Sequence, residues 1–182
     1  IVLAWAFSIT IERKDSMNNK NFKFPDTAAY EFVINALKDR GVTYEDIAEM
    51  AYNLQKKFVP NIQMDEVKKD TIDVLHKREV LNNAMVGLEL DRLATQGLIK
   101  EPLESIIMND SGVFGVDEGI ALNIANIYGT IGITNYGYID REKTGVTKKL
   151  DEAKDGTSNT FIDDIVGAIA SAVSAKIAHR NN

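Results

Sequence analysis

The sequence predicts an all-α protein with a single domain, and three observations lead to this expectation. From Pro25 onward, apolar residues recur at the three- and four-residue spacing of helices, with regular start and stop signals between the segments. No pair of alternating segments is joined by a hairpin turn, which argues against a sheet. The chain has 182 residues, of which 45% are hydrophobic, and a chain of this size can bury one sizeable core.

Two helices are expected in the first third of the chain. The first opens at Pro25, and Gly41 ends it because glycine takes the left-handed backbone conformation that other residues resist. Thr43 caps the second helix, with Asp46 at the spacing of a capping box. Pro60 stops this helix, since proline cannot continue the hydrogen-bond ladder.

A long helical stretch is expected from about residue 65 to 97, with a bend between His76 and Glu79. Its apolar face either closes the domain or pairs with a second copy of the chain, and we favour a homodimer. A short helix follows between Leu103 and Met108. From Gly112 onward glycine, alanine and serine become frequent, which is typical of helices that pack closely.

The apolar run at residues 1–11 has no preceding basic residue and is too short to span a bilayer. Met17 follows it, and the first clear helix start comes soon after. We therefore expect Met17 to be the natural start, with residues 1–16 as an upstream extension and residues 17–182 as the helical domain. The alternative is that the run adds an edge strand or a packing arm.

The composition limits the partners. The 27 acidic and 21 basic side chains give a net charge of −6, which argues against a nucleic-acid partner and against charge-driven binding to an anionic membrane. A phosphorylated substrate would need a bound cation or a local basic patch. The chain has no cysteine, which fits a reducing compartment. We expect a cytoplasmic protein without a membrane span and with at most peripheral membrane contact.

Two pairs of acidic residues open two helices that are rich in small residues. Asp117 and Glu118 open one, where Asp117 shares a face with apolar side chains. Asp163 and Asp164 open the last helix, in which alanine, glycine, serine and valine lie on nearly all sides. We expect this helix, at about residues 161–178, to be the central one. Carboxylates in such a place are unfavourable unless they are paired or bind a metal.

A simpler interpretation exists for each pair alone. The helix dipole favours acidic residues in a first turn, and Thr160 with Asp163 has capping-box spacing. Two such pairs favour a shared site, because Asp140 and Asp151 lie between them in segments bounded by glycines. Carboxylate oxygens are the ligands that Mg²⁺ prefers. His76 and His179 are too isolated in sequence to indicate a zinc site.

Four blocks resemble the phosphatidylglycerophosphatase A family. In order, they are Val116–Glu118 (VDE), Tyr138–Asp140 (YID) with Lys143, Leu150–Asp151, and Phe161–Ala172 (FIDDIVGAIASA). The sequence GVTYED at Gly41 and the Lys77–Val80 segment look like the soluble Gram-positive branch, described as low-temperature-requirement C-like. Enzymes of the family also carry a Pro-Gly-Thr-x-Gly-Ser motif and membrane-spanning helices, and residues 1–110 contain neither.

The resemblance implies Mg²⁺-dependent hydrolysis of a phosphate monoester, with phosphatidylglycerophosphate as the substrate. The partner would be a phosphorylated small molecule or a phospholipid head group. Two alternatives stay open: a non-catalytic helical protein that binds a metal or a partner, and a soluble phosphatase for a non-lipid substrate. In the enzyme interpretation Lys143 contacts the phosphate, the metal ligands are drawn from Asp117, Glu118, Asp163 and Asp164, and Asp140 and Asp151 add ligands or act as the base for the attacking water.

Overall fold

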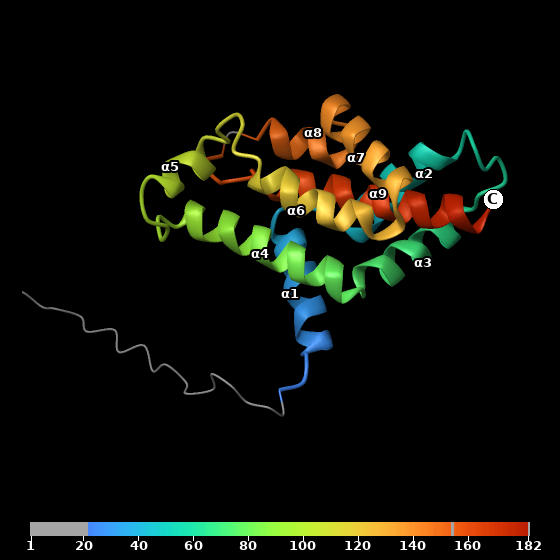
Figure 1. Cartoon of the computed structure of the whole chain (residues 1–182), viewed down its shortest axis with the longest axis horizontal. Coiled ribbons are helices and arrows are strands. Elements are labelled where there is room, and N and C mark those ends of the chain that lie inside the picture. Colours follow the sequence, from blue (N-terminus) through green and yellow to red (C-terminus); the bar gives the residue numbers. More distant parts are fainter. Residues whose placement is uncertain (1–21, 154, 182) are drawn as a thin grey trace, which may run out of the picture.

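The computed structural model describes residues 22–153 and 155–181, so the expected extension at residues 1–16 lies outside the described residues. Within this part every regular element is a helix, as the sequence predicts, and the helices form an elongated bundle (Figure 1). The elements are α1 (Asp26–Asp39), α2 (Tyr44–Gln55), α3 (Met64–Leu75), α4 (Arg78–Thr95), α5 (Leu103–Met108), α6 (Val116–Ala125), the 3₁₀ turn η1 (Asn126–Tyr128), α7 (Thr130–Glu142), α8 (Val146–Asp151) and α9 (Ile162–Arg180).

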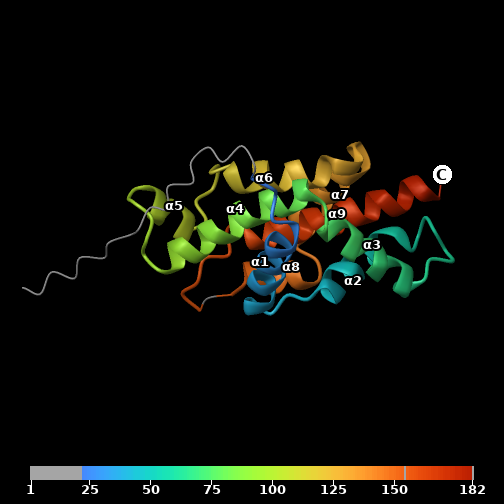
Figure 2. The same cartoon turned by 90° about the horizontal axis from the view of Figure 1, so that it is seen from below.

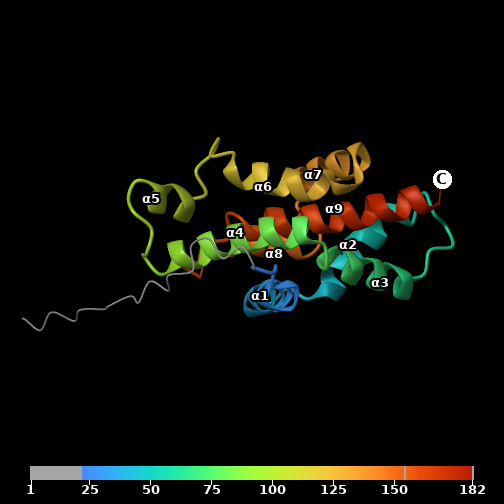
Figure 3. The same ribbon diagram turned by 60° about the horizontal axis from the view of Figure 1, so that its bottom comes forward.

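The predicted central helix is confirmed. α9 runs through the middle of the bundle, with α6 and α7 on one side and α2 and α3 on the other (Figure 3). Every residue from Ile162 to Ala175 is buried. Because most of these side chains are small, helices approach α9 closely on several sides. A Cβ added at Gly167 would lie only 3.0 Å from the Ile139 Cγ2 atom of α7.

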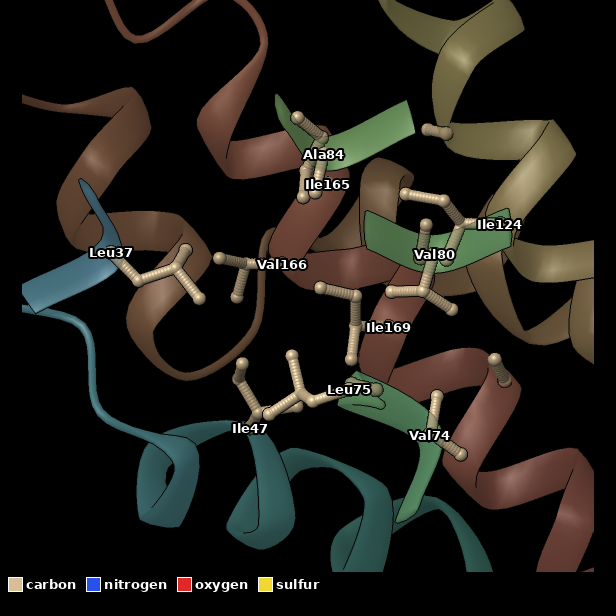
Figure 4. Close-up of a cluster of buried hydrophobic side chains, with 14 of the residues drawn as sticks. Leu37, Ile47, Val74, Leu75, Val80, Ala84, Ile124, Ile165, Val166 and Ile169 are labelled. Atoms are coloured by element: carbon tan, nitrogen blue, oxygen red, sulfur yellow. The ribbon is translucent and has the colours of Figure 1, made fainter. Parts of the chain in front are cut away.

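A cluster of buried apolar side chains joins α9 to helices from the first two thirds of the chain (Figure 4). The branched side chains of α9 meet residues of α1, α2, α3, α4 and α6. The apolar face of α3 and α4 is therefore buried inside the chain and closes the domain, so a homodimer, which stays a prediction, would need another surface. The labelled residues are Leu37, Ile47, Val74, Leu75, Val80, Ala84, Ile124, Ile165, Val166 and Ile169.

Most local start and stop signals act as predicted, but α2 ends at Gln55, before the predicted stop at Pro60. Thr43 and Asp46 form the capping box of α2, and Gly41 has the left-handed φ of +72° after α1. The bend expected near residue 76 is a break, because α3 ends at Leu75 and α4 begins at Arg78. In Figure 2, α1 and α2 lie on the side of α9 opposite α6 and α7. No helix in the described part of the chain is both long and apolar enough to cross a bilayer.

The N-terminus of α9 is capped by a residue of another helix. Asp91 of α4 is buried, and its carboxylate accepts hydrogen bonds from the Phe161 and Ile162 backbone N–H groups at 3.1 and 2.9 Å and from the Ser158 hydroxyl at 2.6 Å. Burial raises the pKa of Asp91 to about 6, although these hydrogen bonds oppose the shift.

The capping-box interpretation of Thr160 and Asp163 is wrong. The Thr160 hydroxyl donates to the Ile107 carbonyl at 2.6 Å instead, and the Asp163 side chain is engaged elsewhere. Asp91 thus supplies the acceptor that the first turn of α9 needs, and it fixes the turn that carries Asp163 and Asp164.

We expect Asp91→Ala to lower the free energy of unfolding by about 2–3 kcal/mol, because two buried N–H groups would lose their acceptor. Asp46→Ala, which removes the more exposed capping box of α2, should lower it by only about 1 kcal/mol. Urea unfolding of both variants measures the difference. Equal losses would contradict a special role for the buried cap.

Candidate metal and phosphate site

Three carboxylates from two helices converge at one point. Asp117 and Glu118 stand in the first turn of α6, and Asp164 stands in the first turn of α9. One oxygen of each lies within 4.8 Å of the others. Gly115 directly precedes α6 and has a φ of +67°, a left-handed conformation that favours glycine. The packing of α6 along α9 therefore builds this three-carboxylate cluster.

Two oxygens of this cluster lack partners. Asp117 Oδ1 and Glu118 Oε2 are shielded from solvent and have no hydrogen-bond donor. Unpartnered buried carboxylate oxygens are strongly unfavourable, and a native protein seldom leaves them so. A hard divalent cation would satisfy them, since such ions take carboxylate oxygens as ligands. The donor set and the orphaned oxygens both fit Mg²⁺.

A second group of carboxylates surrounds Lys143, directly after α7. Its Nζ atom lies 2.8 Å from Asp163 Oδ2 and 2.9 Å from Asp140 Oδ1. Asp164 Oδ1 and Asp151 Oδ1 follow at 3.9 and 4.0 Å. We call these four residues with Lys143 the lysine cluster. Its members come from α7, α8 and α9, so segments far apart in the chain meet here.

The two clusters share Asp164, and the charge around it is unusual. Burial, together with the negative charge of Asp163, raises the pKa of Asp164 to about 8, which Lys143 opposes. Burial also raises the pKa of Asp163 to about 6, even though its bonds to Lys143 and the Asp164 N–H act in the other direction. Near neutral pH the Asp164 carboxyl is therefore largely protonated without a metal, and a divalent cation would displace that proton.

Burial and neighbouring charges also shift the pKa values of Glu118 and Lys143. The neighbouring Asp117 carboxyl raises the pKa of Glu118, and burial raises it further. Burial alone would lower the pKa of Lys143, but the charges and hydrogen bonds of Asp163 and Asp140 outweigh it and raise that pKa. Lys143 thus carries a permanent positive charge at neutral pH.

The structure brings the predicted site residues together in two adjoining groups. Asp117, Glu118 and Asp164 form the three-carboxylate cluster, whereas Asp140, Asp151 and Asp163 surround Lys143. Asp163, predicted as a fourth metal ligand, faces the ammonium. The chemical role of each residue stays a prediction.

Two residues of the site were missed in the sequence. Desolvation raises the pKa of Asp110, Lys143 lowers it, and the charges of Asp151 and Glu118 raise it, which places Asp110 near both clusters. It stands in a loop of turn-forming residues, which gives no functional signal. Tyr136 is buried, with its hydroxyl beside Asp164 but in no hydrogen bond of ordinary geometry. Tyr136 lies four residues before Asp140, so both side chains are on the same face of α7, and this spacing could have indicated that Tyr136 is near the site.

The chain is similar to several known proteins. Residues 32–179 match the family model described as phosphatidylglycerophosphatase A. The chain is 50% identical over 144 residues to the protein YutG of Bacillus subtilis (strain 168), which covers 79% of this chain and 87% of that protein. It is 47% identical over 143 residues to YpjQ of the same organism, covering 79% of this chain and 80% of YpjQ.

Solved structures show the same fold. The low temperature requirement C protein from Listeria monocytogenes matches with a TM-score of 0.82 and 45% identity, covering 85% of this chain and 97% of that one. A protein from Bacillus stearothermophilus matches with a TM-score of 0.81 and 47% identity, covering 89% and 98%. The family model spans most of the chain, including both acidic pairs, and these relatives are 45–50% identical to the chain over the regions that align. The chain therefore belongs to the phosphatidylglycerophosphatase A family, as its four sequence blocks predict.

Proposed function

We propose that this protein hydrolyses a phosphate monoester with the aid of Mg²⁺, and that its substrate resembles phosphatidylglycerophosphate. The observation that carries the proposal is the pair of buried, unpartnered oxygens on Asp117 and Glu118, two carboxylates that gather with Asp164 beside a lysine ammonium. Family membership supports a metal-dependent phosphatase. We further propose that the protein acts in the cytoplasm.

Each part of the site has a role in this scheme. Asp117, Glu118 and Asp164 would hold the ion, with Asp163 close behind in the same turn. A bound Mg²⁺ ion neutralises phosphate charge and makes a coordinated water more acidic. The Lys143 side chain is 27% exposed, and its ammonium would bind a phosphate oxygen and orient the phosphate group.

Asp140 and Asp151 suit the removal of a proton from the attacking water. Their side chains are 38% and 41% exposed, so solvent reaches them, whereas Asp163 and Asp164 are buried. A carboxylate that contacts solvent and also lies beside the ammonium that binds the phosphate can remove a proton from a water molecule next to that phosphate. Either aspartate would fill this role.

Apolar residues beside the site favour an amphiphilic substrate. Val113 is fully exposed and Val116 is 46% exposed, and both lie just before the Asp117–Glu118 pair. Exposed apolar groups at a site that binds a charged head group suit the apolar part of a lipid. They also provide a peripheral contact with the membrane without a spanning helix.

Phosphate release from the purified chain tests the proposal. We expect release from phosphatidylglycerophosphate in detergent micelles when Mg²⁺ is present and none when EDTA replaces it. Glycerol 3-phosphate and p-nitrophenyl phosphate should react more slowly, because they lack the lipid part. Faster release from the soluble esters would support the non-lipid phosphatase, and Mg²⁺ binding without release from any ester would support the non-catalytic alternative.

A further inference from the structure

The Lys143 ammonium sits in an environment suited to a metal ion. Carboxylate oxygens of Asp140, Asp151, Asp163 and Asp164 lie within 4.0 Å of its Nζ atom. An ordinary surface ion pair places one or two carboxylates near a lysine, and it contributes little to stability. Gathering four carboxylates around one point is instead the arrangement by which proteins bind hard cations.

We propose that the Lys143 ammonium occupies the position of a second metal ion, so that the chain binds one divalent cation between Asp117, Glu118 and Asp164 and uses Lys143 as the second positive charge. This inference rests on the metal site of the proposed function. It adds that the lysine cluster would itself bind a divalent cation if the ammonium were removed.

Asp164 links the two positions. One of its oxygens joins the three-carboxylate cluster, and its Oδ1 atom lies 3.9 Å from Lys143 Nζ. Two-metal phosphatase sites hold their ions about 3.5–4 Å apart to clamp one phosphate group. A carboxylate shared between two adjoining cation positions is what such a pair requires. Here one of the two positions is filled by a side chain of the protein.

The backbone holds the ammonium in place. Lys143 has a φ of +43°, a left-handed conformation that is unfavourable for a residue with a Cβ atom, and its N–H donates to the Ile139 carbonyl at 2.7 Å. The same peptide both ends α7 and turns the side chain toward α8 and α9. Lysine at a position that favours glycine or asparagine indicates that the side chain is needed there.

A purely structural counter-ion would behave differently from a cation substitute. If Lys143 only neutralises its neighbours, a neutral side chain at this position leaves the acidic residues protonated or hydrated and creates no ion site. If Lys143 replaces a metal, the neutral side chain leaves carboxylates ready to bind one. The number of bound divalent ions therefore separates the two roles without reference to catalysis.

Mn²⁺ is a suitable probe, because it binds oxygen ligands and can be followed by calorimetry and by electron paramagnetic resonance. We expect one bound Mn²⁺ per wild-type chain, with the spectrum of an isolated ion. Lys143→Gln and Lys143→Met should each bind two, with the broadened spectrum of a coupled pair. One ion in a folded Lys143→Gln or Lys143→Met chain would overturn the inference. So would a coupled pair in the wild type, whether or not the variants fold.

Lys148→Gln is the matched control. Lys148 lies in α8, is 62% exposed, and pairs with Glu152 at 3.8 Å, so its loss changes the net charge equally without opening the lysine cluster. The Lys148→Gln variant should bind one ion. A second ion bound to this variant would show that the loss of any positive charge is enough to add an ion.

The double variant Lys143→Gln/Asp117→Asn should keep one ion. If the wild type binds no Mn²⁺ at all, the proposed metal site fails, whereas one ion in both wild type and Lys143→Gln overturns only the present inference.

Discussion

Asp164→Asn is expected to weaken Mg²⁺ binding by about 100-fold or more and to abolish metal-dependent phosphate release. Asp164 supplies an oxygen to the three-carboxylate cluster and also lies beside Lys143, so it is shared by both parts of the site. Loss of a group that merely supports a metal ligand typically weakens binding by about 10- to 100-fold. Loss of a proposed ligand should therefore have at least that effect.

The fold should tolerate this change. Burial and the neighbouring Asp163 raise the pKa of Asp164 to about 8, so near neutral pH the metal-free protein already holds this carboxyl largely in its protonated form. Asparagine has nearly the same shape and no charge, so the unfolding midpoint without metal should be unchanged or higher. Calorimetric titration with Mg²⁺ and urea unfolding without it measure the two effects separately.

Asp65→Asn is the control for a simple helix-dipole effect. Asp65 stands in the first turn of α3, is exposed, and lies in no acidic cluster. Like Asp164 in α9, it is an acidic residue in the first turn of its helix, and its loss should leave Mg²⁺ binding unchanged. If Asp164→Asn binds Mg²⁺ as tightly as Asp65→Asn does, the carboxylate serves the helix and not an ion.

The sequence predicts most of the helices because their signals are local. Thr43 and Asp46 lie three residues apart, and their capping box forms whatever the rest of the chain does. The central place of α9 is also readable, since a helix without a polar face must be covered on all sides. The break between α3 and α4 was foreseen only as a bend, because no proline or glycine marks His76 or Lys77.

The site could be predicted only in part, because its geometry depends on contacts between distant segments and not on local signals. The acidic pairs stand out because carboxylates on small-residue faces are unfavourable alone, and the structure gathers them. Their division into an ion site and a lysine cluster depends on the angle between α6, α7 and α9, which no local pattern encodes. Asp91 shows the same limit: it lies near the end of α4 with no signal in its own segment, and its partners are about 70 residues away in the chain.

The close packing that creates the site leads to a second large effect, expected at Gly132. A Cβ atom at this position of α7 would lie 2.0 Å from the Ala125 carbonyl oxygen at the end of α6. Neither atom can rotate away, since both belong to the backbone or are fixed to it. Gly132→Ala must therefore push α7 off α6, which should lower the free energy of unfolding by about 3 kcal/mol or more.

Gly137→Ala provides the contrast on the same helix. Gly137 is exposed, and a Cβ added there would meet no atom within 4 Å. Alanine is favoured over glycine inside a helix by about 1 kcal/mol, so this variant should be as stable as the wild type or more so. Urea unfolding of the two variants isolates the contact with Ala125, and similar stabilities would show that α7 and α6 are not held in this close packing.

The displacement of α7 in Gly132→Ala should also lower the rate of phosphate release. α7 carries Asp140, and Lys143 follows at its C-terminal end, so a shift of the helix moves the ammonium relative to Asp163 and Asp164 on α9. The three-carboxylate cluster is built from α6 and α9 without α7. Folded Gly132→Ala should therefore lose more in phosphate release than in Mg²⁺ affinity, whereas an equal loss of both would mean that α7 also sets the spacing between α6 and α9.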